Sequence, residues 1–179
     1  MIKRFFRRFK KKEVQMSPIE VFRSRGVKIG QNVDIINSQI DYCFSNLITI
    51  GNNVTITNAT ILAHDASTKK FIGYSKVGRV NIGDDVFIGY GAIVLPNTTI
   101  GNKVIVGAGT VVAKDIPDNV VVVVVGNPCR IICSFDDYIE RNKSNLKDHP
   151  VSNVLWNKKT KLQKQQMFEL LENTMGYDL

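Results

Sequence analysis

Few side chains in this sequence could carry acid–base, metal or nucleophilic chemistry. The histidines are His64, in the segment ILAHDAS, and His149, in KDHP. A neutral imidazole can take the proton of a hydroxyl group as that group attacks a carbonyl, which is the work of a general base near neutral pH. Two histidines are too few for a catalytic zinc site built from three imidazoles, so no metal is expected. His149 is predicted to be a surface residue.

The cysteines offer no recognisable reactive pair. Cys43, Cys129 and Cys133 are odd in number, and no two of them have the spacing of a zinc knuckle or a dithiol redox motif. A nucleophilic cysteine would also need a neighbouring base that the sequence does not show. We therefore expect three reduced, buried thiols.

A strict repeat of six residues must position these side chains. Aliphatic residues recur at Ile82, Ile88, Val94, Ile100, Val106 and Val112, and glycine follows four of them, at Gly83, Gly89, Gly101 and Gly107. A second small or β-branched residue comes four positions after each aliphatic, at Val86, Ala92, Thr98, Val104, Thr110 and Ile116. A period of six suits a short strand plus a tight corner. The pattern predicts an all-β fold, a parallel β-helix with three hexads per coil and one continuous aliphatic core.

Glycine and asparagine are expected to shape the corners of this coil. Corners need backbone conformations with φ above zero, which glycine adopts freely and asparagine tolerates better than most residues. The asparagines at or near the expected corners are Asn32, Asn52, Asn53, Asn58, Asn81, Asn97 and Asn102.

The repeat divides the chain into three parts. An irregular first coil opens at Ile29, and a regular second coil follows with Ile50, Ile56 and Leu62 facing inward and Val54, Thr60 and Ala66 as their partners four positions on. The next aliphatic in phase should be residue 68, but the repeat resumes only at Ile82. We therefore predict a β-helix over residues 29–132 from which residues 68–81 are ejected as a loop, and such loops commonly carry function. Residues 133–179 are predicted to be a tail with helices over 136–142 and 159–174.

Residues 1–28 form a basic N-terminal segment. Its first ten residues, MIKRFFRRFK, would place five apolar side chains on one face of a helix and five basic ones on the other. Such a segment could lie on an anionic membrane surface or remain a solvated helix, and both alternatives stay open. The absence of a long apolar stretch and of a secretory signal predicts a cytoplasmic site of action, with peripheral contact at the inner membrane face as the alternative. The net charge of +8 favours an acidic partner without identifying it.

The segment IGDDVFIGYGAIVLPNTTIGNKVIVGAGTVVAKDIPDNVVVVVVGNPCRII resembles the signature region of the hexapeptide-repeat acyltransferases. It is most similar to the branch that contains galactoside, maltose and xenobiotic acetyltransferases and the sugar O-acetyltransferases of surface polysaccharide pathways. The resemblance covers residues 29–132, because the hexads, the VVAKDIP turn and the GNPCR ending occur in order. It implies a left-handed coil, a homotrimer and acetyl-CoA as the acetyl donor.

The same resemblance implies a role for each candidate site residue. His64 stands where relatives carry the catalytic base, and the backbone N–H of Tyr90, after Gly89, stands where they stabilise the oxyanion. Acetyl-CoA would run past Ala108, Gly109 and Ala113, with Lys114 and Arg130 at its phosphates and Pro128 beside its adenine. Acceptor contacts are expected from Asp41, Tyr42 and Asn46 in the irregular first coil, from the loop and from a neighbouring subunit.

The implied activity is acetyl transfer from acetyl-CoA to a sugar hydroxyl in surface polysaccharide biosynthesis, with a small xenobiotic alcohol as the alternative acceptor. A non-catalytic β-helix scaffold is the alternative from another class. A nucleic-acid binder is disfavoured, because the repeat shows no interleaving of aromatic and basic residues. Serine acetyltransferases and sugar-nucleotide N-acetyltransferases carry N-terminal domains that are absent here, and the γ-class carbonic anhydrases need a third histidine.

Overall fold

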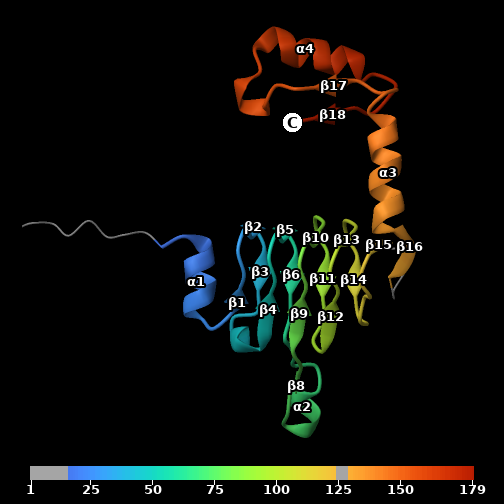
Figure 1. Ribbon diagram of the computed structural model, residues 1–179. Helices are drawn as coiled ribbons and strands as arrows, with labels where there is room; N and C mark the ends of the chain where they lie inside the picture. The colour runs from blue at the N-terminus through green and yellow to red at the C-terminus, as the bar shows by residue number, and fades with distance from the viewer. Residues whose placement is uncertain (1–15, 124–128) are drawn as a thin grey trace, which may run out of the picture.

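The computed structural model describes residues 16–123 and 129–179. The basic amphipathic stretch at the N-terminus and Pro128 lie outside these residues, so their predicted roles stay predictions. A short helix, α1 (Pro18–Ser24), stands at the N-terminal end of a stack of short strands (Figure 1). The C-terminal part of the chain leaves the other end of the stack along helix α3 (Phe135–Asn145).

The stack consists of three parallel sheets, and each coil contributes one strand to each sheet, as the repeat predicts. The first sheet contains β1 (Lys28–Ile29), β4 (Ile48–Ile50), β9 (Val80–Ile82) and β12 (Thr98–Ile100). The second contains β2 (Asp34–Ile36), β5 (Thr55–Thr57), β10 (Phe87–Ile88), β13 (Val104–Val106) and β15 (Val120–Val123), with β16 (Arg130–Ser134) added antiparallel at its edge. The third contains β3 (Gln39–Ile40), β6 (Thr60–Ile61), β11 (Ile93–Val94) and β14 (Val111–Val112).

The core of the stack confirms the hexad columns from Ile82 to Ile116. All twelve predicted positions are buried, none of them more than 5% exposed. The second coil departs from the prediction, because Ile61 rather than Leu62 faces the core and Ala59 replaces Thr60. Only five positions separate the stacked core residues Ile56 and Ile61, whereas six separate their partners in the next coil. The corner between β5 and β6 is therefore one residue shorter than the corner between β10 and β11.

The corner glycine Gly83 does not have the positive φ that we expected of glycine there. Asn32, Asn53, Asn58 and Asn97 do adopt positive φ. A Cβ on Gly83 would lie 2.8 Å from the carbonyl carbon of Gly101 in the next coil. Glycine at this position therefore permits the close approach of successive coils rather than a left-handed conformation.

Asparagine and aspartate side chains link the coils along the same edge. The backbone N–H of Asn52 donates to Asp84 Oδ1 at 2.6 Å, that of Asp84 donates to Asn102 Oδ1 at 2.8 Å, and that of Asn102 donates to Asp118 Oδ1 at 2.7 Å. This ladder satisfies exposed backbone donors at the corners, which is why Asn52 and Asn102 need no positive φ. Asn81 lies inside β9 instead of at a corner.

The ejected loop projects from the side of the stack (Figure 1). It begins with β7 (His64–Asp65), contains helix α2 (Lys69–Ile72) and returns through β8 (Lys76–Val77). The loop ends two residues earlier than predicted, because Val80 is fully buried and already belongs to β9.

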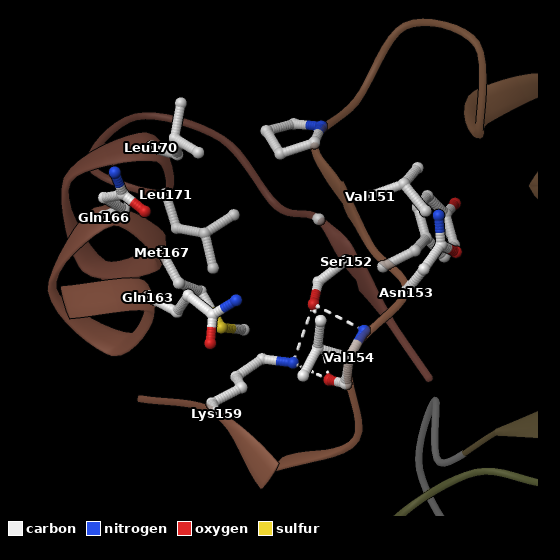
Figure 2. Close-up of a pocket in the computed structure, with 13 residues that line it drawn as sticks. Val151, Ser152, Asn153, Val154, Lys159, Gln163, Gln166, Met167, Leu170 and Leu171 are labelled. Carbon is white, nitrogen blue, oxygen red and sulfur yellow. Dashed lines mark hydrogen bonds between the residues drawn. The ribbon is translucent and has the colours of Figure 1, made fainter. Parts of the chain in front are cut away.

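The C-terminal tail contains the two predicted helices and an additional pair of strands. After α3, strands β17 (Val151–Ser152) and β18 (Tyr177–Asp178) pair in parallel, and η2 (Trp156–Lys158) and α4 (Lys161–Leu170) connect them. Lys159, with a side chain only 2% exposed, donates to Ser152 Oγ at 2.7 Å, to Asp178 Oδ1 at 2.6 Å and to the carbonyl of Val154. Figure 2 shows this ammonium at the side of a cavity of about 280 Å³ between α4 and β17. All three of its N–H donors have acceptors within the tail, so Lys159 stabilises the tail and has no donor left for a ligand.

Candidate active site at the root of the ejected loop

His64 is held by a buried carboxylate from the preceding coil. Asp41 Oδ2 lies 2.5 Å from His64 Nδ1, and the Asp41 side chain has no exposed surface. The backbone N–H of Ala63 donates to the same oxygen at 2.9 Å. The N–H groups of Cys43 and Phe44 donate to Asp41 Oδ1 at 3.0 and 3.1 Å. With Nδ1 committed to Asp41, Nε2 is the ring nitrogen left to meet a substrate.

The environment of Asp41 keeps its carboxylate charged. Burial alone would raise the pKa of Asp41, but the hydrogen bonds from His64, Phe44 and Ala63 together outweigh burial and hold the pKa below its ordinary value. A charged carboxylate on Nδ1 fixes the tautomer of the imidazole and stabilises the imidazolium that forms when Nε2 takes a proton.

This arrangement corrects the role that the sequence predicted for Asp41. We expected Asp41 to contact the acceptor, but its buried side chain contacts His64 and three backbone N–H groups instead. Stacking explains the pair, because Ile40 lies beside Ile61 in the third sheet and thereby brings the residues that follow each strand together. In the sequence, the separation of Asp41 and His64 by about one coil length is the signal that could have revealed this contact.

The root of the loop fixes the backbone on which His64 sits. His64 and Asp65 pair antiparallel with Val77 and Lys76. Lys76 Nζ lies 2.6 Å from Asp65 Oδ2, and this hydrogen bond is the main reason why the pKa of Asp65 lies well below its ordinary range. The Phe44 ring lies 5.1 Å from the imidazole, measured between ring centroids. Both contacts limit the movement of the imidazole.

A cavity of about 470 Å³ opens beside His64. Its lining includes Tyr42, which is 73% exposed, and Cys43, but not Asn46, which is exposed on the 3-10 helix η1 (Ser45–Leu47). The expectation of three buried thiols is wrong: Cys43 is exposed on the irregular turn of the first coil, and Cys129 and Cys133 are only partly buried. Phe22 and Arg25 complete one wall of the cavity. Sequence reasoning missed both, because they precede the repeat.

Tyr90 occupies a tight turn between β10 and β11. The Ala92 N–H donates to the Gly89 carbonyl at 3.1 Å, and Gly91 has a φ of 71°, as expected for a type II turn with Tyr90 at its second position. Among the described residues, the Tyr90 N–H has no acceptor, whereas its carbonyl accepts from the Gly109 N–H at 2.7 Å. Gly89 is buried, and the Tyr90 side chain is 68% exposed. The turn thus presents a free backbone donor.

Within one chain, His64 and Tyr90 lie on the two opposite edges of the third sheet that are formed by the ends of its strands. Tyr90 is at the corner that leads into the sheet, between β10 and β11, whereas His64 follows β6 at the corner that leads out of it. Ala108 and Gly109 continue the Tyr90 edge one coil further on, and Ala113 and Lys114 continue the His64 edge. One subunit alone therefore does not bring the predicted base and the predicted oxyanion donor together.

Lys114 and Arg130 line one cavity of about 330 Å³ beyond β14, together with Pro117 and Cys129. Both side chains are exposed, and neither forms an ion pair with any carboxylate in the described part of the chain. Two cations beside one cavity would attract a phosphate-bearing ligand. The structure thus brings together two of the residues predicted to meet the donor phosphates.

Comparison with known proteins places this architecture in a family. Residues 79–114 match the bacterial transferase hexapeptide family. Protein CapG of Staphylococcus aureus is 39% identical over 144 residues, and the match covers 76% of this chain and 81% of CapG. The chain belongs to the hexapeptide-repeat transferase family. Membership carries with it the left-handed β-helix that the sequence resemblance implied.

Other relatives agree over the repeat. Galactoside O-acetyltransferase of Lactococcus lactis is 37% identical over 112 residues, which are 63% of this chain and 52% of the relative. The chain spans about half the length of several curated relatives that it matches. A hexapeptide-repeat acetyltransferase of Vibrio cholerae, solved with acetyl coenzyme A, is 28% identical with a TM-score of 0.54, over 62% of this chain and 61% of that one.

Two further findings concern the described residues alone. Nowhere in residues 16–123 or 129–179 do three His, Cys, Asp or Glu side chains gather as they would around a metal ion. No helix within these ranges has both the length and the apolarity needed to cross a bilayer.

Proposed function

We propose that this protein is an acetyl-CoA-dependent O-acetyltransferase that acts on a sugar hydroxyl in surface polysaccharide biosynthesis. The contact of 2.5 Å between His64 Nδ1 and Asp41 Oδ2 carries this proposal. It supplies an oriented general base on a transferase scaffold. An alcohol is a weak nucleophile until a base removes its proton, so an O-acyltransferase needs such a group.

The described residues support a simple sequence of proton movements. Acetyl-CoA supplies the acetyl group as a thioester. His64 Nε2 removes the proton of the acceptor hydroxyl as its oxygen attacks the carbonyl carbon, and the Tyr90 N–H donates to the oxyanion that develops. The imidazolium then gives the proton to the departing thiolate. Asp41 remains charged throughout and stabilises the imidazolium between these two proton transfers.

The surface of the stack fits the donor in two ways. A Cβ built on Gly109 meets nothing within 4 Å, so the turn one coil beyond Tyr90 is open on its outer side, where an extended pantetheine chain could pass. Lys114 and Arg130, neither in an ion pair within the described residues, line one cavity together with Asp115 and would meet the nucleotide phosphates there. The acetyl coenzyme A complex of the Vibrio cholerae relative supports the choice of donor.

Assembly as a homotrimer would complete the site. Because His64 and Tyr90 lie on opposite edges of one sheet, the base of one subunit and the oxyanion donor of its neighbour can meet only across an interface. The similarity to a galactoside O-acetyltransferase supports a sugar as the acceptor. The exposed Tyr42 ring in the cavity beside His64 is suited to stacking against a sugar ring.

The direct test compares His64→Ala with His149→Ala in an assay of thiol release from acetyl-CoA with sugar acceptors. Loss of the general base should lower kcat by roughly 100-fold or more. His149 lies in the tail, where its Nδ1 is 3.0 Å from the Asn145 carbonyl, so its replacement should leave the rate nearly unchanged. Full activity of the folded His64→Ala variant would remove His64 from the mechanism.

A further inference from the structure

The cavity beside His64 contains an arginine whose position is fixed by local structure. Arg25 is the C-cap of α1, a helix that starts with a capping box between Ser17 and Glu20. Its guanidinium carbon lies 4.7 Å from the centroid of the Tyr42 ring. Arg25 and Tyr42 therefore form a cation–π pair that lines the same cavity as His64.

This guanidinium has no anionic partner among residues 16–123 and 129–179. Asp41 is the one carboxylate that lines the cavity, and its two oxygens are taken by His64 and by three backbone N–H groups. The guanidinium carbon lies over the Tyr42 ring, and no hydrogen bond or ion pair within the described residues uses the side-chain N–H donors of Arg25. The cavity consequently offers a cation without an ionic partner in the described residues to whatever molecule reacts at His64.

We propose that the acceptor is an anionic sugar, and that Arg25 binds its carboxylate or phosphate while Tyr42 packs against the sugar ring. The proposal rests on the acetyl-transfer function proposed above. The edge of a guanidinium matches the two oxygens of a carboxylate or a phosphate with two parallel hydrogen bonds. A neutral sugar would leave these donors without a partner, so binding through Arg25 discriminates between charged and neutral acceptors.

The donor does not account for Arg25. The cavity with Lys114 and Arg130 shares no lining residue with the cavity that contains Arg25. Each cavity therefore has its own cationic side chains, as expected for an enzyme that binds an anionic donor and an anionic acceptor at separate places.

Matched pairs of acceptors test the proposal. We would measure kcat/KM for acetyl transfer to glucose and glucuronate, to galactose and galacturonate, and to glucose and glucose 6-phosphate. The proteins would be the wild type, Arg25→Met and Arg25→Lys. Lys28→Met serves as the charge-matched control, because Lys28 is exposed, close in sequence and absent from the cavity lining. Melting temperatures would verify that each variant is folded.

We expect the wild type to prefer the anionic member of at least one pair by tenfold or more. Arg25→Met should lower kcat/KM for that acceptor much more than for its neutral partner and so abolish the preference, whereas Arg25→Lys should retain part of the preference and Lys28→Met all of it. A preference in the uronate pairs alone identifies a carboxylate, and one in the phosphate pair alone identifies a phosphate.

Three results would overturn the proposal. Equal rates with neutral and anionic acceptors in the wild type would leave the acetyltransferase standing and remove the anionic acceptor. An equal loss with both acceptors in Arg25→Met would make Arg25 a structural residue. Transfer to no sugar at all would overturn both the proposed function and this inference.

Discussion

Asp41 and His64 are 23 positions apart in the chain, yet the Asp41 carboxylate lies 2.5 Å from the His64 imidazole. The β-helix produces this proximity, because residues about one coil apart stack directly on one another. Ile40 and Ile61 are such a stacked pair, and Asp41 and His64 follow them on the same edge. The proposed catalytic pair thus depends on the register of two successive coils.

Replacing Asp41 with Asn should lower kcat by at least about tenfold, because an amide cannot stabilise the imidazolium as a carboxylate does. Asn is nearly isosteric, so its oxygen can still accept some of the hydrogen bonds that Asp41 receives. The measurement is the kcat for acetyl transfer at saturating donor, alongside His64→Ala and the double variant. A double variant much slower than His64→Ala alone would show that Asp41 acts separately from the imidazole.

Asp41 should also make stability depend on pH in the acid range. Its pKa is lowered in the folded state, so its contribution to stability is fully present above the ordinary value of about 3.9 and is lost as pH falls through the folded value. The difference in melting temperature between wild type and Asp41→Asn should therefore be largest near neutral pH and shrink below about pH 4. Asp34→Asn, at an exposed position of β2, provides the control. A difference that is constant from pH 3 to pH 7 would contradict this account.

The sequence predicted the part of the fold that depends on local period. Each hexad from Ile82 to Ile116 places its own aliphatic in the core, so the columns could be located without any knowledge of distant contacts. The inward face of the second coil was wrong by one residue after Ile56, because the shortened corner changes the phase. A single missing corner residue leaves little trace in a pattern where Thr60, Ile61 and Leu62 could all form a strand.

The site was harder to predict than the fold. His64 stands out because it precedes the interruption of the repeat, but the role of Asp41 requires the stacking of coils, and Arg25 caps a helix outside the repeat. The strand pair of the tail was missed for a similar reason. Val151 and Tyr177 pair across 26 positions, and neither segment has the alternating pattern of a strand.

The cavity with Lys114 and Arg130 predicts how the enzyme distinguishes between donors. Changing both residues to alanine should raise the KM for acetyl-CoA several-fold, because two charge-assisted contacts with phosphates are lost. The KM for acetyl-pantetheine, which lacks those phosphates, should hardly change. Steady-state kinetics measure the KM for each donor. An equal change in both KM values would mean that Lys114 and Arg130 do not bind the phosphates.

The turn at Tyr90 allows its backbone donor to be removed selectively. Proline is favoured at the second position of a type II turn, so Tyr90→Pro should fit the turn and delete the N–H together with the tyrosine side chain. Loss of one oxyanion donor should lower kcat by about 100-fold, whereas Tyr90→Ala, which keeps the N–H, should retain most of the rate. Ala108→Pro, in the equivalent turn one coil further on, shows by its melting temperature whether such turns accept proline.

Mixed assemblies then test whether the site is shared between subunits. Within one chain, His64 and Tyr90 lie on opposite edges of the third sheet, so a shared site takes its base from one subunit and its donor from another. In the proposed homotrimer, co-expression of His64→Ala and Tyr90→Pro chains with different affinity tags would give hybrids in which one interface between two unlike chains has both groups intact. Such hybrids should recover roughly a third of the wild-type rate, as one intact site of three, although each parent variant is nearly inactive. Hybrids as inactive as their parents would place both groups in the same subunit's site or remove one of them from the mechanism.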